Sequence, residues 1–355
     1  MRKDLDAVLD RNAGFSDGAV KAGALLHIKS IGEIEPPLPK KLEDWHFPRD
    51  WRAYMAASVE RFQRLWEARA DVADDCIPYM APYYGIAEHS SFVGGDVVYG
   101  GNTSYHVHPL SDWSRFDELR LTEDNENFRM LLDSMCTLKE RAAEVGFLPS
   151  LRGVEAPMDM ANAVRGNDLF YDLYDDAENV HRLCAFCLEA GLWTIGHQAA
   201  IVGTVRGCTL SGYGIMMPGR GIGHFSEDAS CLCSAAQYGT FGLPYTRRLL
   251  EQYDCAQAHI HAAGRQVLPA VGTLEKCKFI EISRDPNQPA PISVLKEYER
   301  CFDGKIPIVT VTLEELERER EYLKGRKTIL WLNCDTLAQA KRAVDLAHEI
   351  NDELK

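Results

Sequence analysis

Short apolar or β-branched runs alternate with long amphipathic stretches from residue 76 to the C-terminus. The short runs predict strands, and they are CIPYMA (76–81), GFLPSLRG (146–153), AQAHIHAAG (256–264), KFIEIS (278–283), IPIVTVT (306–312) and TILWLNC (328–334). The stretches between them have apolar positions every three or four residues, which is typical of helices; they cover 125–145, 176–200, 234–253, 313–323 and 336–354. Strands alternating with helices of this length predict βαβ units and a parallel sheet.

The number of alternating elements favours a barrel over a doubly wound sheet. No G-x-G-x-x-G follows an early strand and no G-x-x-x-x-G-K-[ST] occurs, so nucleotide-binding versions of α/β have no support. We therefore predict a (β/α)₈ TIM barrel over residues 76–355. Residues 1–75 read as helix and loop, with one apolar stripe over 48–72, and are predicted to form an N-terminal helical extension.

Composition narrows the classes of function. The chain has 355 residues, of which 46% are hydrophobic and 26% charged, as in ordinary globular proteins. A formal net charge of −14 argues against a nucleic-acid partner, which needs a basic surface. No apolar run reaches the length of a signal peptide or a membrane span, so we expect a cytoplasmic protein without membrane contact. Its eleven cysteines are then expected to be free thiols.

Two histidines one residue apart stand near the end of a predicted strand, in AHIHAAG (258–264). Residues i and i+2 of a strand point to the same side, so the rings of His259 and His261 should face one space. In a barrel, the carboxyl ends of the strands carry the functional groups. The pair therefore indicates one of three things: a metal site, a site where protonated histidines bind an anion, or polar packing in the core.

Three blocks of sequence resemble the uroporphyrinogen decarboxylase superfamily, which includes the corrinoid-dependent methyltransferases. They are GVEAPMDMANAVRGNDLFYDLYDDAENVHRLCAFC (153–187), HFSEDASCLCSAAQYGTFGLPYTRRLLEQY (224–253) and AHIHAAG. The resemblance extends roughly over residues 75–350. The decarboxylase branch has an N-terminal Arg-Gln-Ala-Gly-Arg-Tyr segment, which residues 1–75 lack. The site pattern is thus closer to the methyltransferase branch.

This resemblance implies a zinc site. His259 matches the histidine of the His-x-Cys strand end in the methyltransferases, His261 stands where they have cysteine, and Cys334 is placed like their late cysteine. All three are acceptable zinc ligands, and a fourth position would stay open for a reactant. The resemblance further implies a small-molecule substrate, a homodimer, and a corrinoid carried on a separate protein, because the chain has no D-x-H-x-x-G segment.

Four further residues are candidates for catalysis. Asp228 is interpreted as a fourth ligand, as a partner of a ligating histidine, or as a general acid or base; a helix cap is the structural alternative. Glu155 follows the second barrel strand and is a candidate for a catalytic or substrate-binding role. Arg220 and His224 precede the acidic loop in MPGRGIGHFSED (217–228) and are candidate partners of a substrate carboxylate.

Other groups of residues are weaker candidates for a functional site. Cys184 and Cys187 form C-x-x-C inside a helical pattern, where core packing is the simpler interpretation, and the pair Cys231 and Cys233 lies near the predicted site. His106 and His108, in a Gly/Asn/Ser-rich stretch, are expected to face solvent but leave a rival metal site open. Four tyrosines are candidates for stacking on a planar ligand or for rim packing: Tyr79, Tyr83, Tyr84 and Tyr213.

Three functions follow from these patterns. The first is a zinc- and corrinoid-dependent methyltransferase that activates a thiol or similar acceptor. The second keeps the fold but is a metal-independent decarboxylase or lyase that binds a small carboxylated or tetrapyrrole substrate. The third is a barrel that binds ligands without catalysis.

Overall fold

A seven-stranded parallel sheet forms the centre of the protein in the computed structural model, which describes residues 4–352. Its strands lie in the order β1-β13-β12-β11-β10-β9-β6, and every neighbouring pair is parallel. The bounds of these strands are β1 Ala24–Ile31, β6 Val154–Glu155, β9 Gly221–Ser226, β10 Cys255–His261, β11 Cys277–Ser283, β12 Ile306–Thr310 and β13 Thr328–Cys334. The predicted parallel α/β architecture is confirmed.

Three smaller sheets accompany the central one. They are the parallel pair β2 (Tyr79–Met80) and β5 (Leu148–Pro149), the hairpin β3 (Asp96–Gly100) and β4 (Thr103–Val107), and the antiparallel pair β7 (Cys208–Leu210) and β8 (Met216–Pro218). Over residues 4–352 the strand pairing does not run as one uninterrupted ring, because β2 and β5 pair separately from the central sheet.

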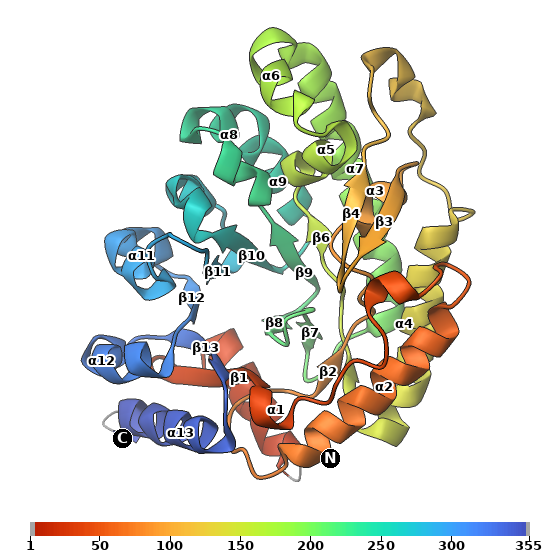
Figure 1. The fold of residues 1–355 in the computed structure, drawn as a ribbon. Coiled ribbons are helices and arrows are strands. Elements are labelled where there is room, and N and C mark those ends of the chain that lie inside the picture. Colours follow the sequence, from red (N-terminus) through yellow and green to blue (C-terminus); the bar gives the residue numbers. More distant parts are fainter. Residues whose placement is uncertain (1–3, 353–355) are drawn as a thin grey trace.

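Helices lie around the outside of the strands, with α11, α12 and α13 beside β12 and β13 (Figure 1). The α-helices are α1 Leu5–Asp17, α2 Trp51–Ala68, α3 Glu88–Ser91, α4 Glu126–Val145, α5 Pro157–Arg165, α6 Asp168–Asp175, α7 Ala177–Val202, α8 Ala235–Phe241, α9 Leu243–Leu250, α10 Leu268–Val271, α11 Pro291–Glu297, α12 Leu313–Leu323 and α13 Leu337–Asp352. Short 3₁₀ segments are η1 Gly32–Ile34, η2 Leu42–Asp44, η3 Trp113–Glu118, η4 Asp228–Leu232, η5 Ala262–Val267 and η6 Glu299–Phe302. None of the helices described is long and apolar enough to cross a bilayer.

Local sequence explains where these helices begin and end. Asn125 caps α4 by accepting a hydrogen bond from the amide of Phe128 at 3.0 Å, and the helix ends at Gly146, whose φ of 86° favours glycine. The periodic stretch 234–253 becomes two helices, because Gly242 separates α8 from α9 and Pro244 stands in the first turn of α9. The predicted helices are thus present, one of them divided.

The first 75 residues differ from the prediction of helix and loop alone. Strand β1 lies inside this segment and pairs in parallel with β13, for example Leu26 with Leu330. Its apolar run ALLHI is buried, because both faces of a parallel strand are covered. A helical extension of 1–75 outside the α/β part is therefore wrong: β1 belongs to the central sheet.

Candidate functional site

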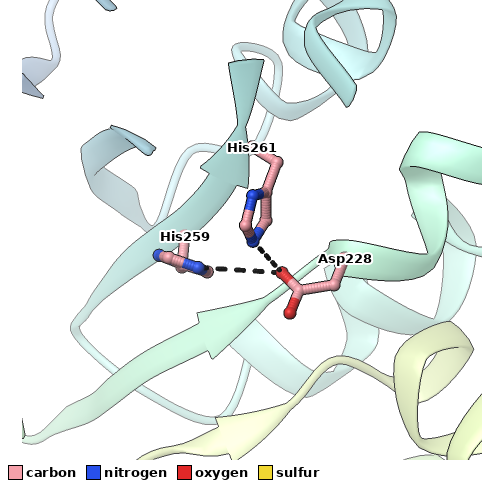
Figure 2. Close-up of side chains that lie close together, drawn as sticks. All are labelled: Asp228, His259 and His261. Atoms are coloured by element: carbon pink, nitrogen blue, oxygen red, sulfur yellow. Dashed lines mark ion pairs between the residues drawn. The ribbon is translucent and has the colours of Figure 1, made fainter. Parts of the chain in front are cut away.

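Two histidines and an aspartate converge at the carboxyl ends of β9 and β10. The Nε2 atoms of His259 and His261 lie 3.7 and 3.5 Å from the same oxygen, Oδ1 of Asp228 (Figure 2). One ligand-type atom from each of the three residues falls within 4.8 Å of the other two, and no other such group of three or more occurs in residues 4–352. The strand pair therefore presents a compact set of nitrogen and oxygen donors.

A second carboxylate orients each imidazole from behind. The Nδ1 of His259 donates to Glu281 in β11, and the Nδ1 of His261 donates to Asp285 just beyond that strand. With Nδ1 occupied in this way, the lone pair of each neutral ring lies on Nε2, which faces Asp228. Carboxylate–histidine pairs of this kind orient the histidine ligands of metal ions.

The charge of this cluster is predominantly negative. Burial opposes the charged form of His259, but Glu281 and Asp228 outweigh it and raise its pKa to about 9. Partial desolvation raises the pKa of Asp228 against the pull of both histidines. Burial likewise opposes ionisation of Asp285, yet the hydrogen bond from His261 holds its pKa below the ordinary value. Three carboxylates around two imidazoles favour a positive charge at this place.

The position of Asp228 is set by a buried carboxyl group. Asp159, in α5, accepts hydrogen bonds from the backbone amides of Asp228 at 2.7 Å and Ala229 at 2.6 Å. These amides begin the 3₁₀ segment η4 directly after β9. Burial and the neighbouring acids Asp228 and Glu227 raise the pKa of Asp159 well above its ordinary value. The loop that carries Asp228 is therefore anchored from the helix layer.

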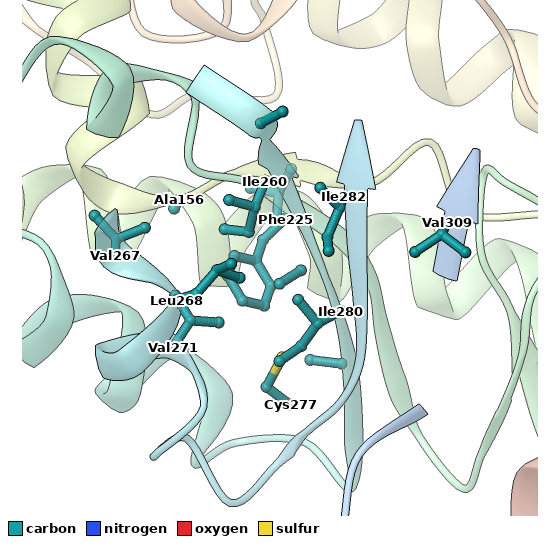
Figure 3. Close-up of a cluster of buried hydrophobic side chains, with 14 of the residues drawn as sticks. Ala156, Phe225, Ile260, Val267, Leu268, Val271, Cys277, Ile280, Ile282 and Val309 are labelled. Carbon is teal, nitrogen blue, oxygen red and sulfur yellow. The ribbon is translucent and has the colours of Figure 1, made fainter. Parts of the chain in front are cut away.

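Strand alternation explains which residues reach this cluster. In β10, His259 and His261 face the inside, whereas Ile260 packs into the outer core with Val267 and Leu268 (Figure 3). The same alternation in β13 turns Trp331 inward and Cys334 outward, into the outer core. Cys334 therefore does not join the histidines, and its assignment as third ligand is wrong. Asp228, rather than Cys334, is the third residue of the cluster.

Glu155 belongs to a second cluster at the end of β6. Its Oε1 lies 3.6 Å from Nδ1 of His89 and 3.8 Å from Nε2 of His106. Burial opposes the charged form of Glu155, but His89 and His106 outweigh it and keep its pKa below the ordinary value. His106 is half-buried in β4, so the expectation that it faces solvent is wrong. His108 is exposed, as expected, and its Nδ1 donates a hydrogen bond to the carbonyl of Ala163 at 2.8 Å.

The two predicted carboxylate partners lie at different places along β9, His224 within the strand and Arg220 just before it. His224 is buried inside, and its ring lies 4.3 Å from that of Tyr213, centroid to centroid. Arg220 precedes the strand, bonds to Asp254 and to the carbonyl of Gln252, and is exposed. The six residues of β9 separate it from Asp228 by about 20 Å at the usual rise per residue. The structure thus does not bring Arg220 into the site.

A cavity of about 610 Å³ lies between α2 and the inner faces of β1 and β2. Tyr79, Tyr83 and Tyr213 line it, as does His224. Tyr84 does not: it is buried in the core and its hydroxyl lies 2.6 Å from that of Ser134. Three of the four predicted tyrosines therefore surround one cavity.

The remaining cysteine candidates lie outside the cluster. Cys184 and Cys187 are buried in α7, as the packing interpretation predicts. Cys231 is half-buried and Cys233 buried, and burial raises their pKa values to about 12 and about 11. All eleven cysteines are free thiols.

Sequence reasoning missed the groups that support the histidines. Glu281 stands in the otherwise apolar run KFIEIS, and an acid at an inward position of a buried strand is a signal that was available. Asp285 and Asp159 carry no comparable signal, since one lies in a loop and the other in the first turn of a helix, where acids are common.

Comparison with known proteins shows a likeness in fold. No family model matches the chain, and no curated protein matches it in sequence. Among solved structures, the chain is similar to a methyltransferase from Methanosarcina mazei, with a TM-score of 0.64 and 11% sequence identity. The match covers 97% of this chain and 98% of that one. At this identity the likeness shows a shared fold over essentially the whole length.

Proposed function

We propose that the protein is a zinc-dependent methyltransferase whose metal is held by Asp228, His259 and His261. The observation that carries the proposal is the paired orientation of the histidines: each ring is fixed by its own carboxylate, and both Nε2 atoms point at one aspartate oxygen. The name of the similar solved structure, a methyltransferase, supports the reaction class.

The donor set fits zinc. Two imidazole nitrogens and one carboxylate are a known combination in catalytic zinc sites, where a fourth position is left for a reactant. Donors about 2.0 Å from a tetrahedral ion lie about 3.3 Å from one another, and the two nitrogens lie 3.5 and 3.7 Å from Oδ1 of Asp228. All three donor atoms lie within 4.8 Å of one another, so the side chains would have to close further to surround one ion.

The residues around the metal would prepare an acceptor for methylation. A bound zinc would lower the pKa of a thiol acceptor, so that it reacts as the thiolate. With zinc bound in place of a proton on each Nε2, Glu281 and Asp285 would hold both histidines in the ligating tautomer. Tyr213, whose ring lies 5.8 Å from that of His259, would cover one side of the acceptor. The methyl group would arrive on a corrinoid carried by a partner protein, as the sequence resemblance implies.

We also propose that the protein belongs to the uroporphyrinogen decarboxylase superfamily and that its strands form an eight-stranded barrel. Seven strands of this proposed barrel would be β1, β2, β9, β10, β11, β12 and β13. The eighth would be interrupted and would consist of β5 followed by β6. The backbone amide of Asp75 donates to the carbonyl of Leu26 at 2.7 Å, which supports contact between β1 and the segment that enters β2. The carboxy-lyase alternative loses support, because Arg220, half of its substrate-binding pair, lies at the wrong end of β9.

Elemental analysis of the purified protein tests the proposal. We expect about one zinc per chain in the wild type and in His106→Ala, and none in His259→Ala or His261→Ala. Methyl transfer from a methylated corrinoid protein to a thiol should be lost in the same two variants. Absence of zinc after incubation with the metal, or full transfer activity after exhaustive chelation, would refute the proposal.

A further inference from the structure

The cations that line the cavity differ in how they are neutralised. Each of its three buried or half-buried arginines has a carboxylate partner. These pairs are Arg61 with Glu35, Arg69 with Asp74, and Arg152 with Glu88. A cation that is withdrawn from water normally has such a partner, because the unpaired charge is costly.

Lys29 is the exception among these half-buried cations. Its Nζ donates to the hydroxyl of Tyr79 at 3.0 Å and to the carbonyl of Tyr213 at 2.9 Å. Both acceptors are neutral, and no carboxylate of residues 4–352 lies within ion-pairing distance of it. An ammonium has three donors, so one remains for a ligand, together with the full positive charge.

Flat aromatic surfaces surround this ammonium. Nζ lies 4.7 Å from the centroid of the Trp331 ring and 5.2 Å from that of Tyr79. The Tyr213 ring is 5.2 Å from that of Trp331, centroid to centroid. Side chains of this kind stack on planar ligands and exclude water, which strengthens any charge pairing beside them.

A buried histidine offers a second unsatisfied polar group in the same cavity. His224 is 6% exposed, lines the cavity, and has no hydrogen-bond partner for its Nδ1. Burial, helped by Arg152, His259 and His89, keeps its pKa well below the ordinary value, so the ring is neutral. A buried nitrogen without a partner costs free energy, which a polar group of a ligand would recover.

We propose that the cavity binds a planar aromatic carboxylate, with its carboxylate paired to Lys29 and its ring stacked between Tyr79 and Tyr213. A volume of about 610 Å³ lies within the range of small-molecule sites. That this ligand is a substrate of the transferase, rather than an effector, rests on the proposed function. The binding itself does not, since neither Lys29 nor Tyr79 belongs to the proposed metal cluster; Tyr213 borders both places, because its ring also lies 5.8 Å from that of His259.

Calorimetric titration with 2-naphthoate and its uncharged analogue 2-naphthamide tests the site. In Lys29→Met, the affinity for 2-naphthoate should fall about tenfold or more, because a charged pair is lost, while the affinity for 2-naphthamide stays the same. Lys29→Arg should retain most of the preference for the anion, which shows that a loss in Lys29→Met is not one of folding. Lys40→Met, at the exposed rim of the cavity, is the matched control and should bind as the wild type does.

The titration is repeated with His261→Ala, which removes a proposed metal ligand. Unchanged binding of 2-naphthoate there would support a site that is separate from the metal cluster, even if zinc and methyl transfer are not found. Three results would overturn the inference: no binding of 2-naphthoate to the wild type, equal binding of acid and amide, or equal affinity in the wild type and Lys29→Met. Loss of the anion preference in Lys40→Met alone would also overturn it.

Discussion

Two clusters at the same end of the sheet have nearly the same inner geometry. In each, one carboxylate oxygen lies between two imidazole nitrogens: Asp228 with His259 and His261 at 3.7 and 3.5 Å, and Glu155 with its two histidines at 3.6 and 3.8 Å. Only the first brings all its donor atoms within 4.8 Å of one another.

The clusters differ in what stands behind the histidines. Behind His259 and His261 are carboxylates. Behind His106 is the hydroxyl of Ser90, at 2.8 Å, and neither ring nitrogen of the buried His89 has a hydrogen-bond partner. A hydroxyl can either donate or accept, so neither it nor an absent partner fixes the tautomer of a histidine, and neither adds negative charge. The comparison teaches that two clusters with similar carboxylate–imidazole distances differ in how closely all their donor atoms approach and in the groups behind the histidines, and both differences favour a cation at the first.

The largest effect should come from removing the charges behind the first cluster. Glu281→Gln with Asp285→Asn keeps size and hydrogen bonding but removes two negative charges. Each change is expected to weaken zinc binding about 10- to 100-fold, so the double variant should lose about two to four orders of magnitude. Competition with a chromophoric chelator measures this affinity. Glu155→Gln, in the second cluster, is the control; an equal loss there would erase the distinction between the clusters.

In the metal-free protein, His259→Leu should be strongly destabilising. Glu281 is 1% exposed and His259 is its hydrogen-bond partner, so the substitution leaves a buried carboxylate alone. Breaking a buried pair in this way costs about 3 kcal/mol or more. Urea denaturation in the presence of a chelator measures the free energy of unfolding. A loss below about 1 kcal/mol would mean that Glu281 does not depend on this histidine.

His89→Phe should change the free energy of unfolding by less than about 1 kcal/mol. The ring of His89 already packs edge-on against Phe92, at 5.7 Å between centroids, and satisfies no hydrogen bond. Replacing it by an apolar ring removes two unsatisfied nitrogens, which offsets the lost attraction to Glu155. The same urea titration applies. Destabilisation as large as that of His259→Leu would show that the second cluster is as tightly coupled as the first.

The smallest effect concerns acid sensitivity. Burial lowers the pKa of His106 below its ordinary value of 6.5, against the opposing effect of Glu155. The folded protein therefore favours the neutral ring, and this contribution to stability is complete above pH 6.5 and is lost as the pH falls below it. His106→Gln should lose less stability on acidification than the wild type does. Thermal unfolding across this pH range measures the difference, and parallel pH profiles would contradict it.

Sequence periodicity predicted the parts of the molecule that depend on strand alternation. The shared face of His259 and His261 follows from their spacing, and the structure places both beside Asp228. The same rule applied to TILWLNC places Trp331 and Cys334 on opposite faces, since they are three residues apart, and the structure turns Trp331 inward and Cys334 outward. That error came from following a resemblance where the local pattern disagreed.

The rest depends on which strands become neighbours. Glu281 supports His259 only because β11 lies next to β10 in a register that pairs these two residues. Lys29 reaches the cavity because β1 pairs with β13, and the run GALLHIKSIG shows neither its partner strand nor its inward residues by periodicity alone. Such relations arise from pairing between distant segments, which one sequence does not specify.

Beyond an irregularity in register at Ala256 and Gln257, the side chains of β10 alternate between its two faces, and this limits how the site can change over evolution. Deleting or inserting one residue ahead of His259 would turn both histidines into the helix layer and bring Ala258 and Ile260 to the inner face. The cluster would then be lost as a whole, not displaced by one position. Point substitutions at inward positions can therefore change the side chains of this cluster one at a time, whereas a change in strand length keeps the cluster only where a bulge absorbs the added or missing residue.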